Sequence, residues 1–438
     1  MKRRSFLLGT AGLATASVTG LVSCSSSGSD AGSGDGGTTT LQMVESLTNP
    51  ARTEVIKTML ADFEQANPTI KVQLVSPPTE QADNKIQQML QAGSGVDVLE
   101  VRDTTVGPFS NNGWIYDMTP DMEAWSGFAE LTDQAQQYSK DASGKTYFIP
   151  YGFYGLTTFY RTDLIEEAGF DAPPKTWDEL LVQASTIHDP GKNRFGYAFR
   201  GGKGGAGNLI AAISSYCAPR IDQANAFKTT DGKSIFAAQE ATAAQETYFK
   251  LFKEASPPSS VAWGYPEMVE GFNNGSTAFL LQDPEVIATI NASKAITKDQ
   301  WSTTPMLLGP GGKTVQPIAA AGWGVAEKSP NKEAAVKLVQ FLSEGASTTF
   351  AKENSLVPIR KEAAEDEFFK TGPWASYVTM TKDPDTWLPV VQPRNVPWNT
   401  EWGNKADAEL QQVLIGKLDP AQMIAGWDAY WTEKWANS

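Results

Sequence analysis

Residues 154–180 read YGLTTFYRTDLIEEAGFDAPPKTWDEL, and this stretch decides the class of fold. It predicts a strand over residues 156–160 and a short helix over residues 163–168. The Pro173-Pro174 pair then breaks the chain, and a T-x-x-E capping box at residues 176–179 predicts the start of another helix. A strand followed so closely by helices is typical of an α/β protein.

The N-terminal part of the chain shows the same alternation of strand and helix. Five segments follow one another from residue 41: predicted strands over 41–45, 70–76 and 96–101, and predicted helices over 50–66 and 84–91. Strands separated by helices predict a mainly parallel sheet. Ligands of open α/β sheets lie beyond the carboxyl ends of the strands, so Arg102 and Asp103 are well placed to bind one.

The C-terminal part adds strands and helices without any internal repeat. A strand is predicted over residues 277–281 and is broken by Pro284. The segment AAAGWGV predicts another strand, after which Ser329 as N-cap and Pro330 at the first helical position predict a long amphipathic helix. Two further helical stretches are predicted in the tail.

The first 24 residues predict export and attachment of a lipid. Lys2, Arg3 and Arg4 precede an apolar run that is rich in small residues, which is typical of an export signal and weak as a membrane helix. RRSFL resembles the twin-arginine motif. LVSC, residues 21–24, resembles a bacterial lipobox, in which cleavage leaves Cys24 as a lipid-carrying N-terminus; the alternative is an ordinary signal peptide. The Ser/Gly-rich segment that follows predicts a flexible tether.

The composition excludes some classes of function. The net charge of −14 argues against binding to nucleic acid, which needs a basic surface. Cys217 is the only cysteine after Cys24, so no disulfide framework is expected. After Val22 no apolar run is long enough to span a bilayer. Many of the 13 tryptophans stand in polar surroundings rich in glycine and proline, where aromatic rings often line binding clefts.

Four blocks of the sequence resemble one known family. The stretch 154–180 is similar to the signature of bacterial extracellular solute-binding proteins of family 1, and GWGVAEKSPNKEAAVKLVQFL (322–342) is similar to its second block. GSTAFLLQDP (275–284) and FEQANPTIKVQLV (63–75) match further elements. The resemblance covers essentially the whole mature chain. It implies a carrier, not an enzyme, that supplies carbohydrate to an ATP-driven (ABC) importer; other branches bind polyamines, iron or phosphate.

The resemblance also implies a two-lobed α/β protein of the periplasmic-binding-protein type (type II). Its chain would cross between the lobes three times, near residues 151–155, 283–285 and 326–330, and the lobes would close on a ligand by hinge motion. The expected domains are a signal peptide, a lipid-anchored tether and two lobes: 1–23, 24–40, 41–151 plus 284–328, and 152–283 plus 329–438. We expect a monomer on the outer face of the bacterial cytoplasmic membrane. Its partners would be a carbohydrate, the permease subunits of the importer and the membrane, the last through Cys24; no cofactor or metal is expected.

The candidate ligand-binding residues combine hydrogen-bonding groups with aromatic rings. Carboxylates and amides pair with sugar hydroxyls, and indole or phenol faces cover the C–H faces of a sugar. The family's loop positions give Glu45, Arg102, Asp103 and Tyr154. The residues added for their sequence surroundings are Asn208, Asp283, Trp323, Arg394, Trp398, Glu401 and Trp402. The chain departs from the family at Glu285-Val286, where an aromatic residue often follows the turn, so a stacking platform there is in question.

Other functions are alternatives to a sugar carrier. A carrier of a non-sugar solute such as a polyamine fits the acidic composition, and an exported glycosidase or lyase fits two carboxylates across a cleft. Residues 202–207 match the G-x-G-x-x-G dinucleotide pattern, but they lie in mid-chain and read better as a flexible loop. His188 is the only histidine, which argues against a histidine-based metal site or a Ser-His-Asp triad.

Overall fold

The computed structural model describes most of the chain from Thr38 onward: residues 38–48, 50–141, 143–222, 224–316, 318–390, 392–393, 396 and 398–437. The predicted signal peptide and Cys24 lie outside these residues, and so does Arg394. The predicted tether enters them only at its last three residues, of which Thr39 and Thr40 already belong to the first strand.

The first lobe is built on a five-stranded sheet with the strand order β2-β1-β3-β12-β4. The strands are β1 (Thr39–Val44), β2 (Ile70–Val75), β3 (Val98–Arg102), β4 (Ile149–Gly155) and β12 (Ile318–Val325). β1, β2 and β3 run parallel, as the sequence predicts, whereas β12 runs antiparallel to both β3 and β4. This lobe comprises residues 39–155 and 318–365 within the described ranges.

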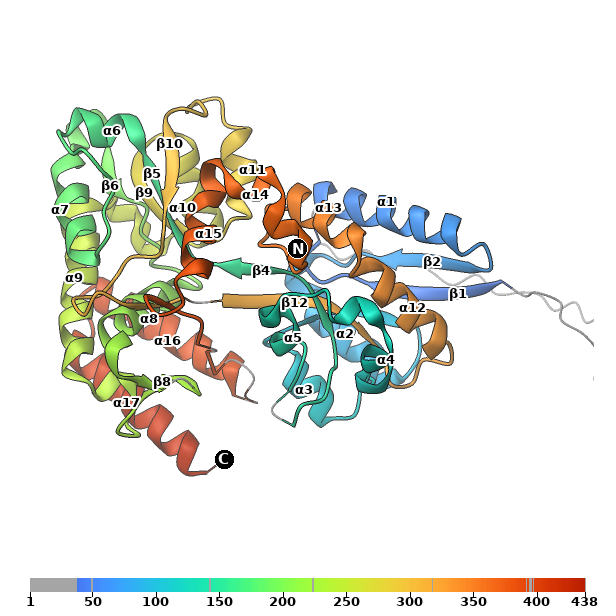
Figure 1. The fold of residues 1–438 in the computed structure, drawn as a ribbon. Coiled ribbons are helices and arrows are strands. Elements are labelled where there is room, and N and C mark those ends of the chain that lie inside the picture. Colours follow the sequence, from blue (N-terminus) through green and yellow to red (C-terminus); the bar gives the residue numbers. More distant parts are fainter. Residues whose placement is uncertain are drawn as a thin grey trace, which may run out of the picture. The chain divides into compact units, whose positions relative to one another are not determined.

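The second lobe is built on a four-stranded sheet with the order β10-β5-β9-β6. Its strands are β5 (Thr157–Arg161), β6 (Phe195–Tyr197), β9 (Thr277–Gln282) and β10 (Trp301–Thr304). Two small two-stranded sheets accompany it: β7 (Ile221–Asp222) with β8 (Asn225–Thr229), and β11 (Thr314–Val315) with β13 (Trp387–Leu388). This lobe comprises residues 157–315 and 371–437, and Figure 1 shows the two large sheets in separate parts of the molecule.

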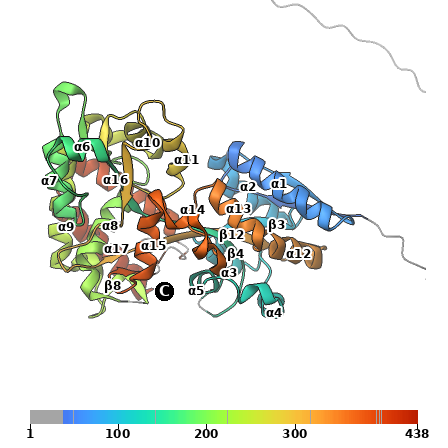
Figure 2. The ribbon, with the colours of Figure 1, turned by 45° about the horizontal axis from the view of Figure 1, so that its top comes forward.

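Helices cover both sheets. In the first lobe α1, α12 and α13 pack on one another and on the sheet (Figures 1 and 2). Its helices are α1 (Pro50–Ala66), α2 (Thr79–Ala92), α3 (Val106–Asn111), α4 (Thr119–Ala124), α5 (Asp133–Tyr138), α12 (Lys332–Leu342) and α13 (Gly345–Glu353). Those of the second lobe are α6 (Thr162–Glu167), α7 (Trp177–Ile187), α8 (Gly205–Cys217), α9 (Gln239–Ala255), α10 (Tyr265–Asn273), α11 (Val286–Asn291), α15 (Ala375–Lys382), α16 (Asn399–Leu414) and α17 (Pro420–Ala436).

The capping box that opens α7 forms as the sequence predicts. The Thr176 hydroxyl accepts a hydrogen bond from the Glu179 amide at 3.1 Å, while the Glu179 carboxylate accepts one from the Lys175 amide. The predicted start of α12 is wrong, because that helix begins at Lys332. Ser329 does not cap it; its hydroxyl donates to Asp97 at 2.5 Å and so ties the loop to the first lobe.

The chain passes between the two sheets three times, but only the first passage lies where it is expected. β4 ends at Gly155 and β5 begins at Thr157. The expected passage at 283–285 is absent from the described residues, since β9 leads to α11 and then to β10, which pairs with β5. The second passage is therefore at Gln316, between β11 and β12.

The third passage also lies later than expected, which changes the assigned lobes. β12 leads into α12, which packs against β12 itself, and then into α13, which packs against α1 and β4. The chain leaves the first lobe after the 3₁₀ helix η6 (Lys361–Glu365), through α14 (Glu367–Lys370). Residues 284–315 thus belong to the second lobe and residues 329–365 to the first, the reverse of the expected assignment. The break at Pro284 marks a loop inside the second lobe, and the break at Ser329-Pro330 marks a loop inside the first.

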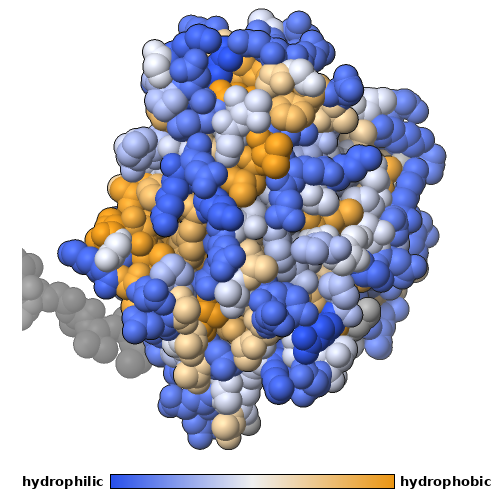
Figure 3. Space-filling view, turned by 90° about the vertical axis from the view of Figure 1, so that its left-hand side faces the viewer, coloured by the Kyte–Doolittle hydropathy of each residue, from blue (hydrophilic) through white to orange (hydrophobic). Residues whose placement is uncertain are grey.

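On the face of the second lobe that Figure 3 shows, polar residues cover most of the surface and apolar residues form separate patches among them. Val182, on α7, is one of the few large apolar side chains that are exposed, at 59%. Among the described residues we find no helix with the length and apolar character that a membrane span requires.

Gly322 marks the closest approach between β12 and β4. The register of this strand pair shifts between Ala321 and Gly322. A Cβ atom at Gly322 would lie 1.9 Å from the carbonyl oxygen of Ile149. Because this oxygen is a backbone atom, a change of side-chain rotamer cannot relieve the clash. The first lobe therefore requires glycine here.

We predict that Gly322→Ala lowers the free energy of unfolding by about 3 kcal/mol or more, because the two strands must separate to admit the methyl group. Urea denaturation of the purified protein measures this. Gly207→Ala is the matched control: nothing lies within 4 Å of its added Cβ, so stability should be unchanged or up to about 1 kcal/mol higher. Equal stability of the two variants would contradict the prediction.

Candidate ligand-binding cleft

Polar side chains gather where the parallel strands of both sheets end. Glu45 follows β1, and Arg102 closes β3. In the second lobe β6 and β9 run parallel, and β9 is followed by Asp283 and Glu285. Because ligands of open α/β sheets bind beyond these ends, the strand ends of the two sheets are the expected position of a site.

A buried ion cluster lies beneath the strand ends of the first lobe. The Arg52 guanidinium donates to Glu45 at 2.7 Å and to Glu100 at 3.0 Å, and all three side chains are almost fully buried. Thr53 donates its hydroxyl hydrogen to Glu45, and the Ser46 amide donates to Glu100. Burial works against a charged Glu100, but Arg52 and these hydrogen bonds outweigh it and hold the pKa of Glu100 below its usual range.

Two tyrosines connect this cluster to the first passage between the lobes. The Tyr151 hydroxyl donates to Glu100 at 2.6 Å and lies 3.0 Å from the hydroxyl of Tyr154. Burial raises the pKa of Tyr154 well above its usual range, and the charge of Glu285 in the second lobe raises it further, against the effect of Arg52. Tyr154 is therefore a neutral, half-buried phenol at the point where the two lobes come together.

The second lobe supplies Glu285, Tyr265 and Arg200 to the same place. Burial raises the pKa of Glu285, against a hydrogen bond from Tyr265 and the charges of Arg52 and Arg200. The Arg200 guanidinium carbon lies 6.0 Å from the centre of the Tyr265 ring, and its Nε donates to the Lys203 carbonyl at 2.7 Å. Burial lowers the pKa of Arg200, while Asp407 and Asp283 act in the opposite direction.

The glycine-rich loop before α8 is held by a carboxylate of the chain itself. Asp407 accepts hydrogen bonds from the amides of Gly204 at 2.7 Å and Ala206 at 3.1 Å. An anion would otherwise find these amides at the start of the helix. These two amides are thus occupied by Asp407.

We take these groups, which lie where the two lobes meet, as the candidate ligand-binding cleft. Its phenols, carboxylates and guanidinium groups supply both donors and acceptors. Within the described residues no group of three His, Cys, Asp or Glu side chains stands close enough to hold a metal ion.

Several predicted site residues lie at this cleft. Glu45 is fully buried and paired with Arg52, Tyr154 is at the passage between the lobes, and Asp283 precedes Glu285 by two residues. Arg102 forms an ion pair with Asp83 of α2, and the Asp103 amide donates to the Ala320 carbonyl. Residues that the sequence analysis missed complete the cleft: Arg52, Glu100, Tyr151, Arg200, Tyr265, Glu285 and Asp407.

The other predicted residues lie in two different settings. Trp323 is fully buried, with its ring 5.2 Å from that of Tyr151, and Asn208 is buried in α8 with no hydrogen-bond partner for its Nδ2. Trp402 is buried among aromatic rings of α17, and Glu401 accepts a hydrogen bond from Tyr430. Trp398 is half-buried, with the Lys434 ammonium 5.7 Å from its ring centre. Burial of Trp323 and Trp402 speaks against stacking on a ligand in this arrangement of the lobes.

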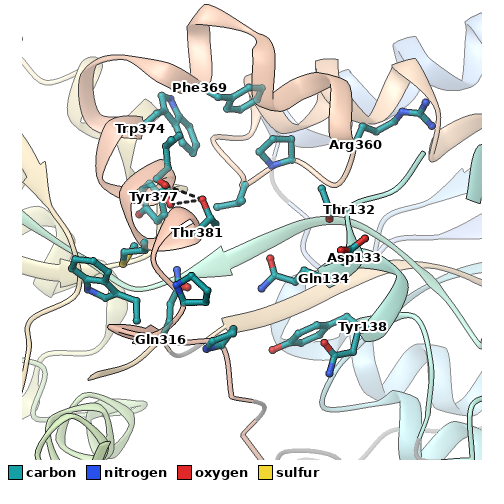
Figure 4. A pocket seen from close by; sticks show the side chains of 18 residues that line it. Thr132, Asp133, Gln134, Tyr138, Gln316, Arg360, Phe369, Trp374, Tyr377 and Thr381 are labelled. Carbon is teal, nitrogen blue, oxygen red and sulfur yellow. Dashed lines mark hydrogen bonds between the residues drawn. The ribbon is translucent and has the colours of Figure 1, made fainter. Parts of the chain in front are cut away.

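A separate cavity of about 400 Å³ lies between α5 of the first lobe and α15 of the second (Figure 4). Tyr138 and Gln134 face it from one side, and Trp374 and Tyr377 from the other. Gln316, at the second passage, lies between them. None of the polar residues named above lines this cavity.

We predict that Arg52→Met lowers the free energy of unfolding by about 3–5 kcal/mol at pH 8, because Glu45 and Glu100 are left buried without their cation. Wild-type Glu100 has a lowered pKa, so its stabilising effect is lost only in acid. Without Arg52, burial favours the protonated acid, so the loss in the variant should shrink as the pH falls from 8 to 5.

Denaturation with urea at both pH values measures this difference. Lys57→Met is the matched control, because it removes the cation of an exposed pair with Glu54 and should cost at most about 0.5 kcal/mol at either pH. An Arg52→Met loss that is equal at pH 8 and pH 5 would contradict the prediction.

Comparisons with known proteins agree with this architecture. The model of the bacterial extracellular solute-binding protein family matches residues 46–347. A putative binding protein of Brucella abortus is 23% identical over 90% of this chain and 92% of its own. The galactooligosaccharide-binding protein of Bacillus subtilis is 25% identical over 84% of each chain, and the mannitol-binding protein of Pseudomonas aeruginosa is 25% identical over 54% and 53%.

Solved structures share the two-lobed fold. Maltose-bound MalE3 of T. maritima superposes with a TM-score of 0.75 at 22% identity, covering 90% of this chain and 98% of that one. The substrate-binding protein of Listeria monocytogenes in complex with cycloalternan has a TM-score of 0.76 at 19% identity, covering 91% and 99%. With the family match over more than half of its length, this chain belongs to the bacterial extracellular solute-binding proteins.

Proposed function

We propose that this protein is an exported receptor that binds a sugar or sugar alcohol in its cleft and delivers it to an ABC importer. One observation carries the proposal: the Tyr154 hydroxyl, tied through Tyr151 to the buried Glu100–Arg52 cluster, stands at the first passage between the lobes. A solute with several hydroxyl groups would bind both lobes at once through such groups, and hydrogen bonds to a charged partner are the strong ones.

The relatives support a polyhydroxylated solute. Their names refer to galactooligosaccharide and mannitol, and the solved structures of the same fold hold maltose, cycloalternan, ribitol and mannitol. Binding by the closed form, and docking of that form on permease subunits, would follow if ligand contacts favour closure of the lobes. We expect the receptor to act as a monomer and without catalysis.

A panel of solutes tests the proposal through thermal unfolding of the purified protein. A ligand at one hundred times its dissociation constant should stabilise the protein by about 2.7 kcal/mol. The panel contains maltose, galactooligosaccharide, mannitol and ribitol, with spermidine and putrescine as the non-sugar arm. A response to the polyamines alone would reject the sugar assignment and keep a carrier of cations, which the acidic cleft residues also favour.

We predict that Tyr154→Phe weakens binding of the responding sugar by about 3- to 10-fold, the loss of one hydrogen bond. Isothermal titration calorimetry measures it. Tyr216→Phe is the control: its hydroxyl bonds Asp178 and Thr247 near the other end of α8, so the change should leave the affinity unaltered. Unaltered affinity in Tyr154→Phe would remove this residue from the site.

We also propose that Cys24 carries the lipid anchor, on the strength of the lipobox-like LVSC segment. Cells that express the wild-type chain should retain it in the membrane fraction and incorporate radiolabelled palmitate into it. Cys24→Ala should abolish the label and release the protein. Labelling of the variant to the wild-type level would show that the lipid, if any, is attached elsewhere.

A further inference from the structure

The cavity between α5 and α15 is a partly enclosed, aromatic space to which the proposed function gives no role (Figure 4). Its volume of about 400 Å³ is in the range of small-molecule sites. Phe369, Trp374 and Tyr377 form one wall, and each of these residues is more than nine-tenths buried. Unfilled apolar space costs stability, because the atoms around it lack packing partners. A ligand would supply those partners.

This cavity and the Tyr154 hydroxyl lie on opposite faces of β4. Tyr138, which lines the cavity, packs its ring against that of Phe153, with 5.4 Å between the ring centres. Successive side chains of a strand point to opposite faces, so Tyr154, the next residue, points away from Tyr138. An occupant of the cavity would therefore be a second ligand, separate from the solute of the proposed function.

Gln316 brings an unpaired amide to the cavity. This residue is 5% exposed and lies at the second passage between the lobes. Its backbone N–H donates to the Leu388 carbonyl at 2.9 Å, but within the described ranges its side-chain amide forms no hydrogen bond. A buried amide without a partner costs free energy, and it offers an acceptor and two donors to an occupant of the space. Gln134 of α5 adds a second amide from the first lobe (Figure 4).

The two charged side chains that line the cavity are both engaged outside it. The Asp133 side chain is almost fully exposed, and the Lys361 ammonium lies 4.0 Å from its carboxylate. The Arg360 side chain extends away from the aromatic wall (Figure 4), and its Nε donates to Glu362 at 3.2 Å. An ionised ligand would lose its water here without gaining a buried counter-ion, so the cavity favours an uncharged one.

The polar groups of the cavity are also too few for a sugar. A sugar carries a hydroxyl on most of its carbons, and each hydroxyl loses its hydrogen bonds to water on burial. The hydroxyls of Thr132 and Thr381 already bond to the backbone of their own helices. Pro358, Val378 and Met380 add mainly apolar surface. The cavity therefore suits a ligand with broad apolar faces and few polar atoms.

We propose that this cavity binds an uncharged, planar heteroaromatic compound whose edge carries a hydrogen-bond donor beside an acceptor, as a lactam or a nucleobase does. The rings of Trp374 and Tyr377 supply surface for its faces. The Gln316 amide, with its own carbonyl and NH2 side by side, pairs with its edge, as glutamine pairs with adenine. The inference does not depend on the proposed function.

A matched pair of compounds tests this chemistry. Quinolin-2-one has the N–H and C=O edge, whereas 2-methoxyquinoline keeps the bicyclic skeleton and lacks the donor. Isothermal titration calorimetry of the purified wild-type protein should show about 10-fold tighter binding of quinolin-2-one, the effect of one or two hydrogen bonds. Quinoline-2-carboxylate, the charged analogue, should bind no more tightly than 2-methoxyquinoline.

Gln316→Leu tests the amide. It removes the hydrogen-bonding group with little change in volume, so it should weaken binding of quinolin-2-one by about 10-fold and leave binding of 2-methoxyquinoline unaltered. Gln91 is exposed on α2, and Gln91→Leu is the matched control that should change neither affinity.

Val378→Trp tests the cavity itself. The larger ring fills the space and should abolish binding of both compounds. Thr379→Trp is the matched control, because it places the same ring on an exposed position of α15 and should leave both affinities unaltered. Thermal unfolding checks that each variant folds, and Gln316→Leu decides alone where Val378→Trp does not.

The outcomes are distinct from those of the proposed function. Binding of quinolin-2-one that falls in Gln316→Leu but not in Gln91→Leu supports the inference, whichever solute the cleft takes. Equal binding of quinolin-2-one and 2-methoxyquinoline, absence of binding of both, or an affinity that Gln316→Leu leaves unaltered would overturn it. Binding of maltose that Val378→Trp abolishes and Thr379→Trp retains would also overturn it, since the cavity would then hold a sugar.

Discussion

The buried contact of Arg52 with Glu45 and Glu100 is the interaction on which the cleft depends. It joins α1 to the end of β1 and the middle of β3, and through Tyr151 it reaches β4. Three charges removed from water are expensive, and apolar side chains of equal volume would often serve stability as well. What apolar residues would not provide is a fixed orientation for Tyr151, and hence for the Tyr154 hydroxyl above it.

The path of the chain explains how two lobes share one cleft. Three passages link them, and the first places Tyr154 at the end of β4 immediately before the second lobe begins at β5. The second, at Gln316, lies beside the cavity between α5 and α15. Hinge motions are absorbed by a few residues at such element ends, so small changes at these passages would move one sheet edge relative to the other.

Local signals in the sequence predict the elements better than their assembly. The capping box at Thr176 and the parallel strands β1 to β3 depend on neighbouring residues, and the structure confirms them. The assignment of residues 284–315 to the first lobe is wrong because strand pairing with β5, far away in sequence, decides it. Pro284 predicts the end of the strand whichever lobe the residues after it belong to.

The cleft was only partly predictable for the same reason. Glu45, Tyr154 and Asp283 follow from strand ends and from the family resemblance, whereas the tryptophans are predicted only from their polar sequence neighbours. Such neighbours say nothing about burial: Trp402 packs against Trp427 and Trp431, where its ring stabilises α16 on α17. Arg200 and Tyr265 lie 65 residues apart and carry no local signal, since only the fold brings them together.

The burial of the two tryptophans bears on how a ligand would close the lobes. Because Trp323 and Trp402 are buried, the proposed recognition of a solute rests on polar groups such as the Tyr154 hydroxyl. The energy of a hydrogen bond falls when donor and acceptor move apart by a few tenths of an ångström, and it falls more steeply than the energy of a stacking contact. A solute held by them would gain most of its binding free energy only when both lobes are in place. Under the proposed function, the geometry that selects the solute would therefore also favour the closed state, which is the state that a permease would bind.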